Sequence, residues 1–123
     1  MKVINKRDEN YPKALLNISN PPENLFVLGN EKILDNFGIA IVGSRNCTKY
    51  GEEVAKSIAY NLSKYNINVV SGMAKGIDSA AHIGTIIGKG KTIAVLGSGF
   101  KHIYPKENIK LLQDIINSGG AII

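Results

Sequence analysis

Cysteine is almost absent from this sequence, which has one, Cys47. A single cysteine excludes an internal disulfide, and it excludes structural zinc sites that are built from cysteine clusters. Long apolar runs are missing too, because none reaches the about 18 residues that a membrane-spanning helix needs. The first ten residues are charged where a signal peptide would be apolar. We therefore expect a cytoplasmic protein that does not act at a membrane.

Arginine is scarce as well, since it occurs only at Arg7 and Arg45. Fifteen Lys and Arg residues stand against ten Asp and Glu residues, which gives a formal net charge of +5. Most of this charge comes from lysines scattered along the chain, a distribution that is typical of a solvated surface. The charge balance favours a polyanionic partner without identifying one.

The chain of 123 residues has room for one domain. Its composition, 44% hydrophobic and 20% charged, is that of an ordinary globular domain and not of a disordered chain. Residues 1–36 are irregular in pattern, with a short helix after Tyr11-Pro12 and a strand over residues 25–28. We interpret residues 1–36 as a lead-in segment that packs on a domain formed by residues 37–123.

From residue 38 onward, a short apolar run, a glycine-rich loop and an amphipathic helical stretch follow one another three times. Runs that are apolar throughout favour strands covered on both faces, as in parallel sheets. The pattern predicts an α/β protein with a Rossmann-like three-layer fold, a mostly parallel sheet and right-handed crossovers. The strands are predicted at 39–42, 67–70, 92–96 and 121–123, and the helices at 54–65, 77–87 and 109–116.

The chain ends inside its last predicted strand. Doubly wound domains usually continue for another strand or more, so we expect part of a larger domain, incomplete at its carboxyl end. The last strand would then leave an open edge that is able to pair with another chain.

Three glycine-rich loops follow the predicted strands. The carboxyl ends of parallel strands meet at one edge of the sheet, where ligands bind, so the loops are expected to converge on one site. Their backbone N–H groups favour an anion such as phosphate. Strand-to-helix turns also need glycine for geometry alone, which leaves an alternative for each loop. The loops are Gly43-Ser44-Arg45, Ser71-Gly72-Met73-Ala74-Lys75-Gly76 and Gly97-Ser98-Gly99-Phe100.

Charged and aromatic side chains extend this prediction. Arg45 is placed to bind a phosphate with two hydrogen bonds, and its alternative is a salt bridge to a helix carboxylate. Lys75 and Lys106 either add charge to the same crevice or lie on solvated surface. Phe100 and Tyr104 either stack on bases or plug the end of the sheet.

Other polar residues near the loops favour structure over chemistry. We interpret Asp78 as a helix cap in preference to a catalytic acid, with His82 hydrogen-bonded to it. Cys47 has no histidine nearby in the sequence to activate it as a nucleophile. The loops contain neither a complete dinucleotide fingerprint nor the Gly-Lys-Ser/Thr of a P-loop, which argues against NAD and ATP. No cofactor or metal is therefore predicted.

Three longer motifs contain the loops and follow one another along the chain. They are Ile39 to Arg45 with Thr48, Tyr50 and Gly51; Ser71 to Asp78 with Ala81-His82; and Thr92 to Gly99 with Tyr104-Pro105 and Asn108. Taken together, these motifs resemble those of the DprA/Smf family of DNA-processing proteins. The resemblance covers nearly the whole chain, including the lead-in segment at Tyr11-Pro12, Pro21-Pro22 and Gly29-Asn30.

This resemblance implies a protein without enzymatic activity that binds and protects single-stranded DNA. It implies a role in loading the RecA recombinase during natural transformation or recombination, and a homodimer whose contacts lie beyond the point that matches Ile123. Its phosphate contacts fall on the first loop, on Ser71-Gly72 and on Lys106. With the loop analysis, the predicted DNA-binding residues are Gly43, Ser44, Arg45, Ser71, Gly72, Lys75, Gly97, Ser98, Gly99, Phe100, Tyr104, Lys106 and Asn108.

Two other functions stay open. One is an enzyme or sensor for a free nucleotide, since related Rossmann domains cleave or sense nucleoside phosphates. It predicts competition by a mononucleotide and an acidic residue in the crevice. The other is a shortened remnant without activity, which would associate through its last strand.

Overall fold

Six strands form one sheet in the computed structural model, which describes residues 1–97, 99–100 and 107–123. The strand order is β1-β2-β6-β5-β4-β3. The pairs among β3, β4, β5 and β6 are parallel, whereas β1 pairs with β2 and β2 with β6 in antiparallel fashion. The strands are β1 (Lys2–Asn5), β2 (Asn24–Gly29), β3 (Gly38–Ala40), β4 (Asn68–Ser71), β5 (Thr92–Ala94) and β6 (Ala121–Ile122).

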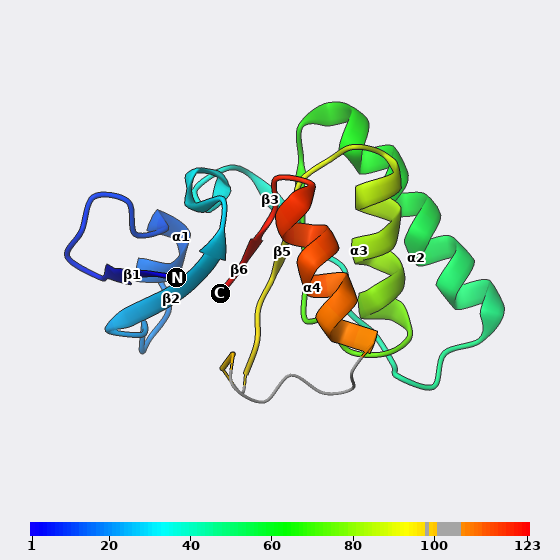
Figure 1. The fold of residues 1–123 in the computed structure, drawn as a ribbon, viewed down its shortest axis with the longest axis horizontal. Helices are drawn as coiled ribbons and strands as arrows, with labels where there is room; N and C mark the ends of the chain where they lie inside the picture. The colour runs from blue at the N-terminus through cyan, green and yellow to red at the C-terminus, as the bar shows by residue number, and fades with distance from the viewer. Residues whose placement is uncertain (98, 101–106) are drawn as a thin grey trace.

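The three long helices lie on one face of this sheet (Figure 1). Each of them connects two neighbouring parallel strands, in the order β3, β4, β5 and β6 across the sheet. Because the strands are added in one direction across the sheet and the crossovers have one hand, the helices lie on the same face. The lead-in segment, with α1 (Lys13–Leu16) and the 3-10 turn η1 (Glu31–Ile33), lies on the other side. The predicted α/β fold with a mostly parallel sheet is confirmed. The long helices are α2 (Lys49–Leu62, continued by η2, Ser63–Tyr65), α3 (Ile77–Ile87) and α4 (Glu107–Asn117).

The core alternates between the two faces of the strands. Ile93 and Ala121 pack with Tyr11 of the lead-in segment, whereas Ala94 and Ile122 pack with residues of α4. Successive side chains of a strand point to opposite faces, so these short strands contribute to both layers. Their continuous apolar runs therefore reflect real burial on both sides of β5 and β6.

The lead-in segment contains a strand that the sequence pattern did not reveal. β1 pairs with β2, and β2 extends the sheet beyond β6. Within β1 only Ile4 is buried, and a short strand with one buried side chain has no recognisable periodicity. The predicted short helix and strand of this segment are confirmed as α1 and β2. The domain boundary at residues 36 and 37 stays a prediction.

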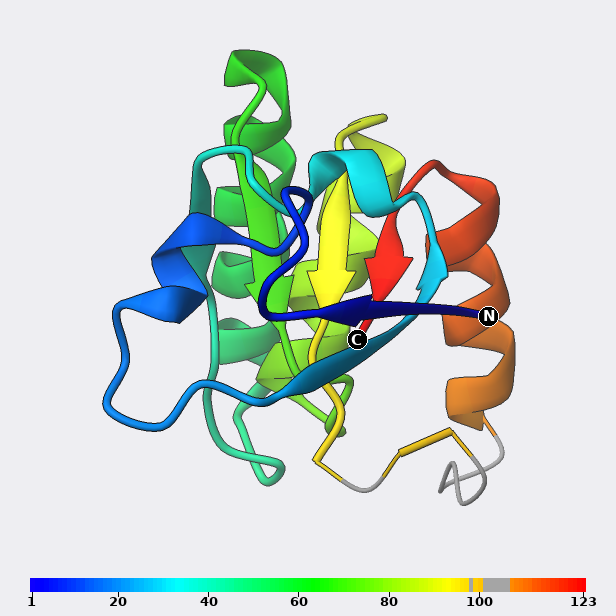
Figure 2. The same cartoon turned by 90° about the vertical axis from the view of Figure 1, so that its left-hand side faces the viewer.

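The last strand is not an open edge. β6 lies between β5 and β2, and Figure 2 shows β1 and β2 crossing in front of the parallel strands. The expectation of an open edge there is wrong because Gly29 of β2 pairs with Ala121. Gly29 has a φ of +91°, and a Cβ there would lie 2.4 Å from the carbonyl oxygen of Gly120. The two edge strands of the sheet are instead β1 and β3, and all three residues of β3 are exposed.

Candidate nucleic-acid interface

The loops after β3 and β4 lie at the edge of the sheet where α2 and α3 begin (Figure 1), and residues of both loops line one pocket. Its volume is about 480 Å³. Helix amino ends carry unpaired N–H groups and a partial positive charge, which favours an anion at this edge. The pocket is lined by Arg45, Cys47, Glu52, Lys75, Gly76, Ser79 and Asn108.

Thr48 fixes where α2 begins. Its backbone is extended, and its side-chain oxygen accepts a hydrogen bond from the N–H of Gly51 at 3.0 Å. This cap places Cys47 just before the helix and Glu52 in its first turn, so both reach the pocket. Neither was among the predicted site residues. The signal that points to them is the capping threonine, Thr48, three residues after the first loop.

Asp78 connects the first two loops. Its buried carboxylate accepts the N–H of Gly43 at 3.2 Å through Oδ1 and the N–H of Gly72 at 3.1 Å through Oδ2. The predicted helix-cap role is wrong, because α3 begins after Gly76 without a side-chain cap bond. The N–H groups of Gly43 and Gly72, which were expected to face a phosphate, therefore donate hydrogen bonds to the Asp78 carboxylate.

The glycines of these loops make room for α3. A Cβ on Gly43 would lie 2.7 Å from Cγ1 of Ile77, and a Cβ on Gly76, whose φ is +82°, would lie 2.5 Å from the carbonyl oxygen of Ser44. The N–H of Ile77 also donates to that same Ser44 oxygen at 3.4 Å. Close packing of the loops on α3 therefore accounts for these glycines without a ligand.

Ser71 and Ser44 differ in their use. Ser71 is buried and donates its hydroxyl to the carbonyl oxygen of Ile41 at 2.6 Å, so it joins β4 to the end of β3 from inside. Ser44 is exposed, and its hydroxyl oxygen accepts the N–H of Asn46 at 3.0 Å. Of the two predicted serines, the exposed Ser44 is the one whose hydroxyl a ligand can reach.

His82 supports the second loop from beneath. The side chain is fully buried, and Nε2 accepts the N–H of Met73 at 3.3 Å. Nδ1 lies 2.7 Å from the Thr92 hydroxyl, which itself donates to the carbonyl oxygen of Val69, so Nδ1 carries the proton. Burial lowers the pKa of His82 to about 4, and the charge of Asp78 opposes this shift. These partners replace the predicted hydrogen bond to Asp78.

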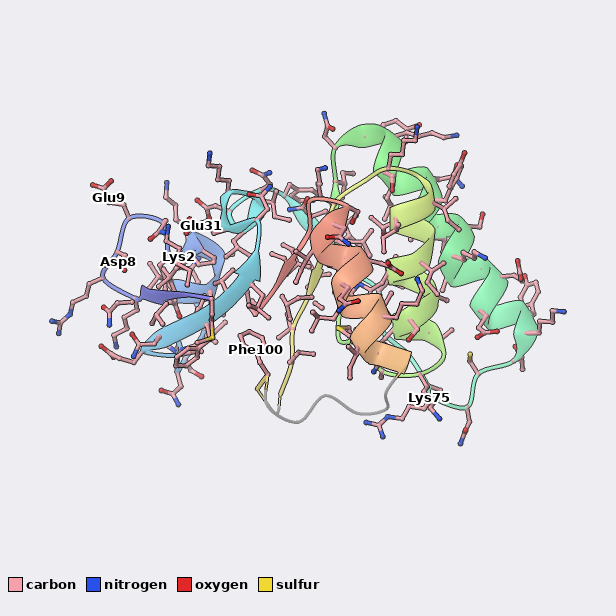
Figure 3. All side chains as sticks on the ribbon, in the orientation of Figure 1. Lys2, Asp8, Glu9, Glu31, Lys75 and Phe100 are labelled. Carbon is pink, nitrogen blue, oxygen red and sulfur yellow. The ribbon has the colours of Figure 1, made fainter. Side chains whose placement is uncertain are left out.

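Arg45 and Lys75 bring positive charge to the pocket. Both residues are exposed, and neither takes part in an ion pair between described residues. The salt-bridge alternative for Arg45 is therefore not observed in this part of the chain. Figure 3 shows Lys75 at the edge of the molecule where the helices begin. The carboxylate of Glu52 reduces the positive charge of the same pocket.

The third loop joins this site only in part. Asn108, near the start of α4, is buried at the pocket and donates its amide to the carbonyl oxygen of Met73 at 2.7 Å. Gly99 and Phe100 instead line an apolar groove of about 620 Å³ beside β2 and Ile123. The ring of Phe100 packs against the cluster that contains Met73, as expected for a plug at the end of the sheet (Figure 3).

The remaining predicted residues add little to the site. Gly97 is exposed, and a Cβ there would meet no atom of the described residues within 4 Å. Ser98, Tyr104 and Lys106 lie outside the described residues, so their predicted contacts stay predictions.

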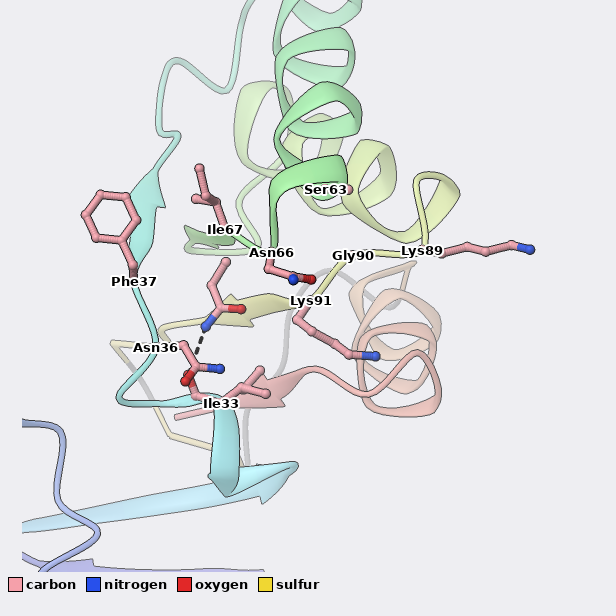
Figure 4. Close-up of a pocket in the computed structure, with 10 residues that line it drawn as sticks. Ile33, Asn36, Phe37, Ser63, Asn66, Ile67, Lys89, Gly90 and Lys91 are labelled. Carbon is pink, nitrogen blue, oxygen red and sulfur yellow. Dashed lines mark hydrogen bonds between the residues drawn. The ribbon is translucent and has the colours of Figure 1, made fainter.

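A second polar pocket lies at the opposite edge of the sheet (Figure 4). Its volume is about 550 Å³, and Phe37, Asn66 and Lys89 are among the residues that line it. α2 and α3 end at this edge, and helix carboxyl ends carry a partial negative charge. Its other lysine, Lys91, donates to the carbonyl oxygen of Ser118 at 3.1 Å. The electrostatics of the helices therefore favour the Arg45 pocket for an anion.

The described residues contain neither a membrane-spanning helix nor a cluster of metal ligands. No helix in that part of the chain is long and apolar enough to span a bilayer. Nor do His, Cys, Asp and Glu residues gather there in groups of three or more that would hold a metal ion.

Comparison with known proteins decides the family. The sequence model of DNA recombination-mediator protein A matches residues 2–123. The chain belongs to the DprA/Smf family. A curated relative, the DNA processing protein DprA of Bacillus subtilis (strain 168), is 42% identical over 102 residues, which are 82% of this chain and 34% of that protein. The resemblance drawn from the three motifs is thus confirmed.

Solved structures of DprA proteins share this fold. The crystal structure of DprA from Streptococcus pneumoniae matches with a TM-score of 0.86 and 40% identity, over 98% of this chain and 42% of that one. DprA from Helicobacter pylori, described for its single-stranded DNA binding mode, matches with a TM-score of 0.80 and 34% identity, over 93% and 53% of the two chains. The present DprA/Smf chain spans between 34% and 53% of these three relatives.

Proposed function

We propose that this chain binds single-stranded DNA through the pocket between its first two loops. The observation that carries the proposal is that Arg45 and Lys75, from different loops, line one pocket at the amino ends of two helices. Neither has an acidic partner among the described ion pairs. The single-stranded DNA binding described for the Helicobacter pylori relative supports the same ligand class.

In this proposal the protein holds the sugar–phosphate backbone. The Arg45 guanidinium donates two parallel hydrogen bonds to one phosphate, and Lys75 binds a second phosphate as a point charge. The exposed Ser44 hydroxyl adds a neutral donor to the same strand. Because phosphates are alike in every sequence, binding is expected to be nearly independent of base sequence and to weaken with salt.

The role of the whole protein extends this proposal. DNA processing, strand protection, loading of RecA, dimerisation and action in the cytoplasm rest on family membership and on sequence, and they stay predictions for this chain. Binding breaks no covalent bond, so the proposal gives no residue a catalytic role.

The test is fluorescence anisotropy of a labelled oligothymidine over a series of salt concentrations. Arg45→Ala is expected to weaken binding by about 10- to 150-fold, since a hydrogen bond to a charged group contributes about 1.5–3 kcal/mol. The slope of log K against log salt should also fall by about 0.7, as expected for one lost phosphate contact.

Arg7→Ala is the matched control, because it removes the chain's other arginine, an exposed residue of the lead-in segment. It should leave affinity nearly unchanged. Folded protein that binds no oligothymidine at low salt, or equal losses in the two variants, would contradict the proposal.

A free nucleotide is the second candidate ligand, and Glu52 is the observation that favours it. This carboxylate lines the pocket beside Arg45 and Lys75, where an enzyme or sensor for nucleotides needs an acidic residue. Under this alternative a mononucleotide displaces oligothymidine when its phosphate concentration is similar to that of the oligothymidine. Under the DNA-binding proposal the mononucleotide competes only at far higher concentration, because it occupies one contact of several.

A further inference from the structure

We propose that Asp78 is a positioning residue for DNA binding, which holds the first and second loops so that their cations face one strand. The inference rests on the proposed function and adds a residue that does not itself touch DNA. It starts from a buried carboxylate whose two oxygens serve two different loops.

The contacts of Asp78 define the relation between the loops. One oxygen accepts the N–H of Gly43, two residues before Arg45, and the other accepts the N–H of Gly72, three residues before Lys75. Asp78 is 6% exposed, so water does not readily replace these bonds. The carboxylate therefore fixes the positions of the two cation-bearing loops relative to each other.

An aspartate fits position 78 better than the neutral asparagine does. Both partners of Asp78 are N–H donors, and an ionised carboxylate offers only acceptors. An asparagine offers one acceptor, and its NH2 group would face the second N–H donor. Asp78→Asn therefore breaks one of the two loop contacts while it keeps the size of the side chain.

The charge of Asp78 acts in the opposite direction from its hydrogen bonds. A buried negative charge behind the loops repels phosphate, so charge alone predicts tighter DNA binding after Asp78→Asn. Loss of the loop contact predicts weaker binding. The sign of the change in affinity thus separates positioning from simple electrostatics.

The experiment compares variants by oligothymidine anisotropy at one salt concentration, after circular dichroism has reported a folded state. Asp78→Asn is expected to bind at least about tenfold more weakly than the unchanged chain. Asp114→Asn is the matched control, since it removes the same charge from a half-exposed carboxylate of α4 and should bind as well as the unchanged chain or slightly better.

Gly72→Ala tests the same link without a change of charge. The added Cβ would lie 2.9 Å from Oδ2 of Asp78, so the carboxylate must move away from the Gly72 N–H. We expect binding to weaken by at least about threefold, in the same direction as Asp78→Asn. If Asp78→Asn does not fold, Gly72→Ala decides alone.

The outcomes separate the inference from the function on which it rests. If the unchanged chain is folded and binds no oligothymidine, the proposed function fails and the inference fails with it. If the unchanged chain binds, and Asp78→Asn and Gly72→Ala bind as tightly or more tightly, only the positioning role is overturned. Weaker binding by both variants, with the control unchanged, supports it.

Discussion

Glu52 is the residue whose charge opposes the two cations of the candidate site. It lies in the first turn of α2, where a carboxylate is stabilised by the helix amino end, and it also lines the pocket of Arg45 and Lys75. The same side chain therefore favours the helix and disfavours a bound phosphate.

The effect of Glu52 is testable by Glu52→Gln. Removal of a negative charge from the pocket is expected to tighten oligothymidine binding by about two- to fivefold at low salt, because unit charges at contact distance in water interact by about 1 kcal/mol. Glu53→Gln is the matched control, since this neighbouring carboxylate faces a different pocket, between α2 and α3. Anisotropy titrations of both variants measure the difference, and an unchanged or weaker affinity for Glu52→Gln would contradict the expectation.

Backbone partners explain why residue roles near the loops were harder to predict than their location. The sequence Gly76-Ile77-Asp78 fits a helix cap as well as a loop link, because both roles use a carboxylate that accepts N–H groups. The N–H groups that Asp78 accepts come from Gly43 and Gly72, and any residue type supplies an N–H. Only the folded chain identifies which backbone groups meet the side chain.

At the scale of elements, α2 and α3 pack unusually closely at one point. A Cβ on Gly84 of α3 would lie 2.2 Å from the carbonyl oxygen of Lys56 in α2. The absence of a side chain at Gly84 thus sets the distance between two helices whose amino ends border the candidate site.

In Gly84→Ala one of the two helix backbones must move to admit the methyl group, which costs about 1–3 kcal/mol. Alanine returns about 1 kcal/mol in a helix interior, so the fold is expected to lose up to about 2 kcal/mol of stability. Gly97→Ala is the control, since its Cβ would meet no atom within 4 Å in the part of the chain that the structure describes. Urea unfolding of the two variants measures the difference, and equal midpoints would show that the helices accommodate the methyl group freely.

The elements differ in how well the sequence predicted them. The helix predicted for residues 77–87 is α3 itself, because Gly76 and Gly88 mark its two ends. The carboxyl ends of parallel strands lie at one edge of a sheet, so the strand pattern also predicted that the first two loops meet. The third loop departs from it, since Phe100 packs in an apolar cluster that forms only when distant segments meet.

At the scale of the whole molecule, His82 makes stability depend on pH. Its pKa is about 4 in the folded state and about 6.5 when exposed, so the unfolded chain binds more protons between these values. A depressed histidine pKa thus destabilises the fold as pH falls from about 6.5 to about 4, by roughly 3 kcal/mol over the full interval.

Urea unfolding at pH 7 and at pH 4.5 measures this dependence. The unchanged chain should lose stability at the lower pH, and a His82→Gln variant, which has no titratable group at this place, should lose less. Equal losses in both proteins would assign the acid sensitivity to other groups.

The pairing of β2 with β6 has a consequence for the time course of folding. Leu28 pairs with Ile122, so this part of the sheet cannot close until synthesis has passed β6. At a synthesis rate of about 5–20 residues per second, β6 is made roughly 5–20 s after the antiparallel pair of β1 and β2. Long-range pairing of this kind also slows folding. During this interval the apolar side of the β1–β2 pair is exposed to solvent. A nascent chain of this protein is therefore expected to bind chaperones until β6 has been made.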